Sequence, residues 1–474
     1  LFELGRPLSS SELVESERLL RRLPHVRSAK VMVNDYGTEA ADVMVVTRDV
    51  FPYNFYYKPS NDNQALFGIS SINIGGLGHE LEYDYIKGNG SDFFYRVPNV
   101  LGTFIDTQFN YAYHFRREGF GFKANKNFVT RQTKHAGGMT ISRYLYGEYD
   151  YEPRSDISTA YFYDKRYIDL WAARAFDSPI TIPELGIDNE PQAVISMNLE
   201  TSQFYERPMV SVDTNFRYHD HLNILLSIGL SSRKYYRDKF VLQFGPTEDI
   251  PTGGALSIVT GFQRGEFRNR KYTAVNYSRG DYFKGIGNIN GLLAIGGFVG
   301  SNGLSDGIFK VKTNYFSKLY TFRHYKFRQF IKFSYTKSIR PDEEYIVSSE
   351  SSLGISGVSS FYLRATEKLN IQFESLIFTP QYILGFRAAL FAFFAYTRTE
   401  NNRNDFFGID HFSGYGLGIR LRNANLAISS IQLRFGFYPN TPLNASQELL
   451  GISTQTRLRM RDFDFQAPEI IPFN

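Results

Sequence analysis

Strict alternation of apolar and polar residues is the feature that most limits how this chain can fold. The stretch "KLNIQFES" (368–375) is typical, because Leu369, Ile371 and Phe373 would share one face of a β-strand while their polar neighbours share the other. Similar short segments, separated by turn residues, continue from Phe51 to the end of the chain. The pattern predicts either several soluble β-sandwiches or one large barrel whose apolar side faces lipid.

Composition favours the membrane barrel over the sandwiches. Aromatic residues make up 16% of the chain, with 43 Phe and 33 Tyr, yet the mean hydropathy is −0.30. A polar lumen combined with aromatic girdles gives this balance. The apolar run "AALFAFFAY" (388–396) is far shorter than the roughly 20 residues of a spanning helix, but it matches the roughly 9–11 residues of a spanning strand. We therefore expect a mainly β fold, a transmembrane antiparallel β-barrel over residues 51–474.

The first 50 residues have a different pattern. The stretch 9–23 predicts a helix, because Ser9 and Glu12 have the spacing of a capping box and leucines return at helical intervals. Two short strands are expected at 28–34 and 42–49. Together these elements predict part of a small α+β domain over residues 1–50.

A search for chemistry along the chain finds no catalytic or ligand-binding pattern. The absence of cysteine excludes disulfides and thiolate metal sites, and the net charge of +5 is spread without a basic cluster. His219 and His221 would share a strand face, but no third metal ligand is suggested nearby. The sequence also lacks a nucleophile elbow and a phosphate-binding loop. We expect no enzymatic activity, no cofactor, no metal and no nucleic-acid partner.

A small α+β unit placed directly before a long barrel resembles the BamA/TamA superfamily of outer-membrane assembly and translocation proteins. In that family, periplasmic POTRA domains precede a 16-stranded barrel. The resemblance covers nearly the whole chain, and it depends on the order of weak motifs. These motifs are "TRDVFPYNFYY" (47–57) at the junction and first strand, "GGLGHELEYDY" (75–85), "EDIPTGGALSIVTGF" (248–262), the penultimate hairpin "GYGLGIRLRNANLAISSIQLRFGFYP" (414–439) and the closing strand "QTRLRMRDFDF" (455–465).

The resemblance implies a location and a mechanism. Residues 1–50 would be the latter part of a POTRA domain in the periplasm, and the barrel would lie in the outer membrane of a Gram-negative bacterium. Sixteen strands are expected, although alternating segments in the sequence leave 18–20 open. The first and last strands would meet in a weakly paired lateral seam that accepts clients. The expected seam residues are Tyr53, Phe55, Tyr57, Thr456, Leu458 and Met460.

The sequence departs from the family at the loop that folds into the lumen. The family's loop arginine, which meets acidic lumen residues, is replaced here by Ser356 within Ile355–Ser356–Gly357–Val358. One acidic partner is replaced by Ala395, whereas Glu374 is retained. The departure leaves open whether the loop lies in the lumen, and it favours a specialised paralogue. The polar lumen residues expected on the strand from 361 to 377 are Arg364, Lys368, Gln372 and Glu374.

The expected partners are the lipid bilayer, unfolded outer-membrane or surface-protein clients, and accessory lipoproteins or other subunits. Two alternatives to general assembly remain. One is a dedicated exporter of a single surface protein or lipoprotein. The other is a passive pore, for which Arg and Lys on the inner faces would favour anions, although porins lack an α+β prefix.

Overall fold

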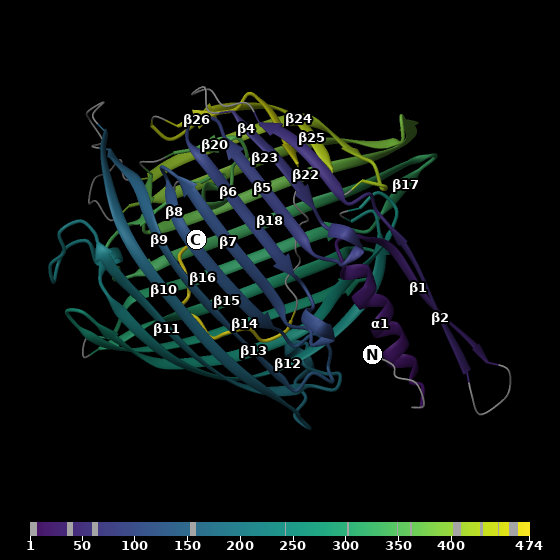
Figure 1. Cartoon of the computed structure of the whole chain (residues 1–474), viewed down its shortest axis with the longest axis horizontal. Coiled ribbons are helices and arrows are strands. Elements are labelled where there is room, and N and C mark those ends of the chain that lie inside the picture. The colour runs from purple at the N-terminus through teal and green to yellow at the C-terminus, as the bar shows by residue number, and fades with distance from the viewer. Residues whose placement is uncertain are drawn as a thin grey trace.

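The computed structural model shows a barrel of tilted strands with a small helix-and-hairpin unit at one end (Figure 1). It describes residues 7–35, 41–58, 65–151, 158–241, 243–300, 303–347, 349–360, 363–401, 409–426, 430–443, 445–454 and 463–474. Within these ranges, no helix is long and apolar enough to cross a lipid bilayer.

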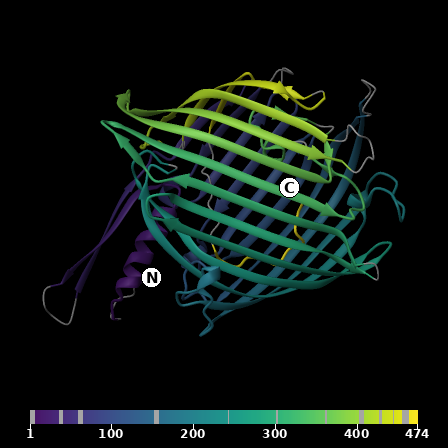
Figure 2. The ribbon, with the colours of Figure 1, turned by 180° about the vertical axis from the view of Figure 1, so that it is seen from behind.

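The barrel is one antiparallel sheet in which each strand pairs with its neighbours in the sequence, as Figure 2 shows from behind. Its strands are β3 (Tyr53–Lys58), β4 (Leu66–Ser71), β5 (Glu80–Ile86), β6 (Gly90–Val97), β7 (Asp106–His114), β8 (Arg117–Lys126), β9 (His135–Tyr151), β10 (Ser158–Asp177), β11 (Gln192–Glu206), β12 (His221–Lys239), β13 (Thr247–Gly265), β14 (Asn269–Phe283), β15 (Gly287–Gly300), β16 (Gly303–Ser317), β17 (Tyr320–Phe322), β18 (Tyr325–Ile339), β22 (Glu367–Ile383), β23 (Phe386–Glu400), β24 (Ile409–Arg422), β25 (Ile431–Asn440) and β27 (Leu450–Thr454).

The strand count differs from the family expectation. The described part of the sheet contains 21 strands. Strands β16 and β17 both pair with β18, so they form one interrupted strand, and the barrel has 20 strands when the two are counted as one. The expected count of 16 is therefore wrong for this chain, and the upper end of the 18–20 range is right.

Short elements lie in the connections between these strands. The 3-10 turns are η1 (Ile74–Gly76), η2 (Val100–Gly102), η3 (Pro183–Leu185) and η4 (Phe216–Tyr218). The remaining short elements are β19 (Tyr345–Ile346), α2 (Glu350–Leu353), β20 (Val358–Ser359), β21 (Arg364–Ala365) and β26 (Ser446–Gln447).

The apolar face of the strands points outward and the polar face points into the barrel. On β22, Phe373 is 40% exposed, whereas Lys368 and Asn370 are 6% and 5% exposed. On β12, Ile228 is exposed while its neighbour Ser227 is buried. An exposed apolar exterior around a polar interior is the arrangement of a barrel that contacts lipid. The expectation of a barrel with its apolar face outward and its polar face inward is thus confirmed by the direction of the side chains.

The N-terminal unit consists of α1 (Ser10–Arg22) and the hairpin of β1 (Val26–Asp35) and β2 (Ala41–Asp49). The predicted capping box does not form, because the Ser9 hydroxyl bonds the Ser11 hydroxyl (2.7 Å) and no side chain caps the helix. We call the barrel end on which α1 packs the near end, and the opposite end the far end.

Helix α1 is attached to the near end by charged side chains. The Arg21 guanidinium makes two bonds to the Asp249 carboxylate at the start of β13, at 2.7 and 2.9 Å. Glu17 pairs with Arg237 of β12 at 3.0 Å. Arg18 is buried, with its guanidinium 4.2 Å above the Tyr235 ring. Bidentate pairs of this kind fix orientation, so the helix is held at a defined place on the rim.

Acid should release this helix. Burial alone would raise the pKa of Glu17, but the Val31 N–H bond and the guanidinium groups of Arg21 and Arg237 outweigh burial and hold that pKa below its usual 4.5. Because the folded-state pKa is lowered, the stabilisation by Glu17 is present above pH 4.5 and is lost as pH falls through the lowered value. Proteolysis of α1 against pH measures this loss. Glu17→Gln should weaken docking at neutral pH, and Glu12→Gln is the control.

The lipid-facing exterior gives a prediction for stability. Ile228→Arg would place a charge among outward apolar side chains, and the expected loss is about 2–4 kcal/mol if the site lies near the bilayer midplane. Unfolding from lipid vesicles in denaturant measures the change. Met209→Arg, at an 89% exposed site between β11 and β12, is the control and should have little effect. An equal loss in both variants would contradict lipid contact at Ile228.

Candidate functional site in the lumen and at the seam

The long connection between β18 and β22, residues 340–366, folds into the barrel from the far end. Val347, Leu353, Ile355 and Val358 are fully buried there. They belong to one apolar cluster with inward-facing wall residues, among them Tyr272 of β14. The loop thus lies in the lumen even though Ser356 occupies the arginine position.

The polar face of β22 holds this loop by its backbone. The Lys368 ammonium donates to the Ser352 carbonyl (2.6 Å), and the Gln372 amide donates to the Gly354 carbonyl (2.8 Å). The Asn370 amide donates to the same Gly354 carbonyl at 3.3 Å. These carbonyls end helix α2, where intrahelical partners are lacking and cationic or N–H donors are favoured. Lys368, Asn370 and Gln372 of "KLNIQFES" therefore cap a helix inside the barrel.

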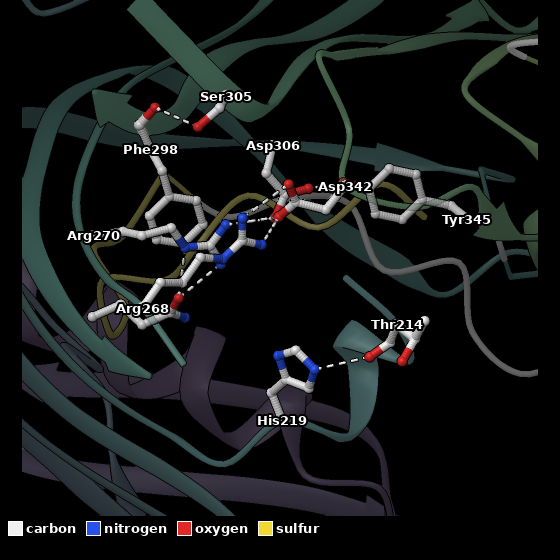
Figure 3. Close-up of polar contacts among 10 residues, drawn as sticks. Thr214, His219, Arg268, Arg270, Phe298, Ser305, Asp306, Asp342 and Tyr345 are labelled. Carbon is white, nitrogen blue, oxygen red and sulfur yellow. Dashed lines mark hydrogen bonds and ion pairs between the residues drawn. The ribbon is translucent and has the colours of Figure 1, made fainter. Parts of the chain in front are cut away.

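A second attachment lies at the far end and consists of charged pairs (Figure 3). Arg268 in the turn between β13 and β14 and Arg270 on β14 both bind Asp342 of the loop, and Arg270 also reaches Asp306 of β16 at 3.4 Å. The Tyr345 hydroxyl donates to Asp306 at 2.8 Å. In this attachment the loop supplies the acid, and the barrel supplies the arginines.

The tip of the loop packs against β25. The Ser356 carbonyl accepts a bond from the Tyr438 hydroxyl at 2.8 Å. Gly357 has φ of 86°, and a Cβ there would collide with Tyr438 and Arg434. Val358 pairs with Gln447 of β26. A wall arginine, Arg434 of β25, thus stands beside the turn at Gly357.

The other predicted lumen residues have different surroundings. Glu374 pairs with Arg420 of β24 at 3.1 Å, so it binds the wall and not the loop. Ala395 is buried in the cluster that packs the loop. Arg364 is exposed and belongs to β21 in the loop, because β22 begins only at Glu367. The expected strand start at 361 is therefore wrong, and the inward polar face begins at Lys368.

The chain after 462 does not continue the sheet. The expected closing strand at 455–465 is wrong at its end, because Phe463 and Phe465 are buried inside the barrel and outside any strand. The closing strand of the described sheet is β27, and residues 455–462 lie outside the described ranges. Pro468 and Pro472 could have indicated from the sequence that this part of the chain is not a strand, since proline interrupts central strands.

The first strand, β3, and the closing strand of the described sheet, β27, are neighbours in the strand order. The outward residues Phe55, Leu450 and Ile452 on these strands are 77%, 70% and 72% exposed, against 51% for Ile258 on a central strand. Tyr53 and Tyr57, also on β3, are 46% and 57% exposed, so the higher exposure belongs to individual side chains and not to the whole of both strands.

The predicted seam residues fall into two groups. Tyr53, Phe55 and Tyr57 lie on β3 and point outward. Their expected partners Thr456, Leu458 and Met460 lie outside the described residues. Strands β27 and β3 are hydrogen-bonded neighbours in the sheet, and on their other sides β27 pairs with β25 and β3 pairs with β4.

The histidine pair has ordinary contacts. The His219 ring bonds the Thr214 carbonyl at 3.0 Å, and the His221 ring bonds the His219 carbonyl at 3.1 Å (Figure 3). Among the described residues, no group of three or more His, Asp or Glu side chains is placed to hold a metal ion.

No protein-family model and no curated protein matches the sequence. Among solved structures, the chain is similar to BamA from Haemophilus ducreyi lacking POTRA domains 1–3, with 10% identity and a TM-score of 0.40 over 95% of this chain and 79% of that one. It is also similar to CdiB from Escherichia coli, with 11% identity and a TM-score of 0.47 over 94% and 70%. TM-scores below 0.5 do not establish a shared fold, so the case for function depends on the geometry of this barrel.

The charged attachment of the loop can be broken selectively. Asp342→Ala should leave Arg268 and Arg270 without their shared carboxylate and cost about 1.5–3 kcal/mol in loop attachment. Hydrogen exchange of the loop amides in the folded barrel should become faster. Asp213→Ala, in the exposed turn between β11 and β12, is the matched control. Unchanged exchange in the Asp342 variant would show that the β22 contacts alone hold the loop.

Proposed function

We propose that this barrel is a non-enzymatic protein assembly or translocation factor in the outer membrane of a Gram-negative bacterium. Unfolded outer-membrane or surface proteins would engage it at a lateral seam between β3 and β27. The observation that carries the proposal is that the first strand, β3, meets the closing strand of the described sheet, β27, in the barrel wall, with Phe55, Leu450 and Ile452 strongly exposed on the outer side.

The physical reason lies in the backbone. A spanning barrel normally satisfies every N–H and C=O group through its ladder, because lipid offers no partners. Opening of the seam between β3 and β27 would free donors and acceptors that can pair with an added strand, which is β-augmentation. Strand β4, which pairs with β3, has six residues, or about 20 Å at ~3.3 Å per residue, which is shorter than the roughly 30 Å hydrocarbon core. The bilayer would have to thin beside it.

The N-terminal unit fits a role in the periplasm. Its hairpin exposes apolar side chains on both strands, among them Met32, Met44 and Val46. Exposed apolar surface with an open strand edge favours contact with another polypeptide. We infer that this unit is part of a POTRA domain and that clients, accessory lipoproteins or other subunits bind there.

The segments that lie in the lumen bear on the two alternative functions, a passive pore and a dedicated exporter. A passive pore needs an open water path, but residues 340–366 and 463–474 occupy this lumen. A dedicated exporter of one surface protein or lipoprotein remains the second candidate. The attachment of the loop through Asp342, with Ser356 in place of a loop arginine, favours such a specialised paralogue.

Crosslinking from the seam tests the proposal. A photoreactive residue at Phe55 or at Ile452 should capture newly made outer-membrane or surface proteins in living cells. The same residue at Ile258 or Leu293, which point outward from β13 and β15, is the matched control and should capture few. Equal capture at all four sites, or none at the seam, would refute lateral engagement.

Depletion followed by an outer-membrane proteome survey separates the candidates. Broad loss of barrel proteins is the expected result for a general assembly factor. Loss of one or a few surface proteins would identify a dedicated exporter. An unchanged proteome with altered solute uptake would indicate a pore.

A further inference from the structure

Residues 463–474 run through the lumen from the near end to the far end. Phe463 lies against Gly280 near one end of β14, and the Ile471 N–H bonds the Tyr272 hydroxyl (2.9 Å) near the other. The two contacts are eight residues apart along the segment (463 to 471) and also along β14 (280 to 272). This separation is about 26 Å at ~3.3 Å per residue. The segment is therefore extended over nearly the thickness of a hydrocarbon core, about 25–30 Å. Both figures place the C mark within the outline of the barrel.

Two aromatic rings of the segment lie where glycine residues of the wall leave room for them. Phe463 is 1% exposed, and a side chain at Gly280 would collide with its ring. Phe465 lies where Gly229 leaves room, among small and apolar side chains. Those side chains are Phe128, Ala136, Ala173, Ala175 and Val194.

The third ring lies at the far end. Phe473 stacks on Tyr345 of the lumen loop, with ring centroids 4.5 Å apart and planes 3° from parallel. The Lys368 ammonium lies 5.6 Å from the centroid of the same ring. Stacking and a nearby cation both favour an aromatic ring over an aliphatic side chain here.

Polar wall groups hold the backbone of the segment. Lys310 donates to the main-chain oxygens of Pro472 and Asn474, the latter at 3.3 Å. Lys368 donates to the Asn474 side-chain oxygen at 3.0 Å. Contacts to the backbone of a bound peptide do not depend on its sequence. Pockets for alternate side chains select a sequence, and recognition of extended peptides commonly combines both kinds of contact.

The opposite side of the segment is open. Gln466, Glu469 and Pro472 are exposed, so the segment lies on the wall as a ligand lies in a groove. A cavity of about 320 Å³ lies at its near end, lined by Asp464 and Phe465 and by side chains of α1. A peptide entering from the near end would thus meet the first two ring pockets directly.

We propose that this wall is a binding track for an extended peptide with spaced aromatic residues, and that residues 463–474 occupy it as a built-in ligand. A client segment with the same spacing displaces them. The displacement by a client depends on the proposed function, whereas the track does not.

Binding of synthetic peptides to the chain ending at residue 462 tests the track. The labelled peptide 463–474 should bind the detergent-solubilised, folded barrel, as measured by fluorescence anisotropy. Replacing Phe463, Phe465 and Phe473 by alanine should weaken binding about tenfold or more, since buried aromatic anchors dominate such contacts. The matched control peptide carries Gln466→Ala on the exposed side, and it should bind nearly as well as the original.

The chain that retains residues 463–474 should bind the same peptide far more weakly, because its own segment fills the track. No binding to the folded shortened chain, or equal binding of the phenylalanine-free peptide, would overturn the proposal. Should the shortened chain fail to fold, the chain that retains residues 463–474 and carries the three Phe→Ala substitutions takes its place and should accept the added peptide. Failure there also overturns the track, while crosslinking from Phe55 decides lateral engagement separately.

Discussion

One ammonium group joins the barrel wall to the two segments that fill the lumen. Lys368 extends from the wall, donates to the Ser352 carbonyl of the lumen loop and to the Asn474 side chain, and lies beside the Phe473 ring. A buried cation needs partners for its hydrogen-bond donors, because isolation in a confined site is costly. The chain supplies them from its own backbone, so the polar inner face and the segments that cover it stabilise each other.

Charge pairing also holds the lumen loop inside the barrel. Attraction between a guanidinium and a carboxylate does not depend on which partner the loop carries. Here the loop contributes Asp342, and Arg268 in the β13–β14 turn and Arg270 on β14 bind it. A loop with serine at position 356 is therefore held by an ion pair at another of its residues.

Local pattern was enough to predict much of this fold. Alternation gave the direction of Phe373 and Lys368, and helical spacing gave α1, since both depend on residues close in sequence. The Ser9 capping box was wrong because a neighbouring hydroxyl competes for the same side chain. The contents of the lumen were not predictable, because pairs such as Arg270 with Asp342 join residues far apart in the chain. The expected strand count of 16 was wrong because it was taken from the family and not from the number of alternating segments in the sequence.

The wall of this barrel is uneven in height. Strands β9 and β10 have 17 and 20 residues, whereas β4 and β5 have six and seven. A spanning strand needs only about 9–11 residues, so the tall side stands well clear of the headgroups while the low side is nearly level with them. Bulky molecules on the cell surface would be kept away from one flank, and lateral traffic in the plane of the membrane would be directed to the other.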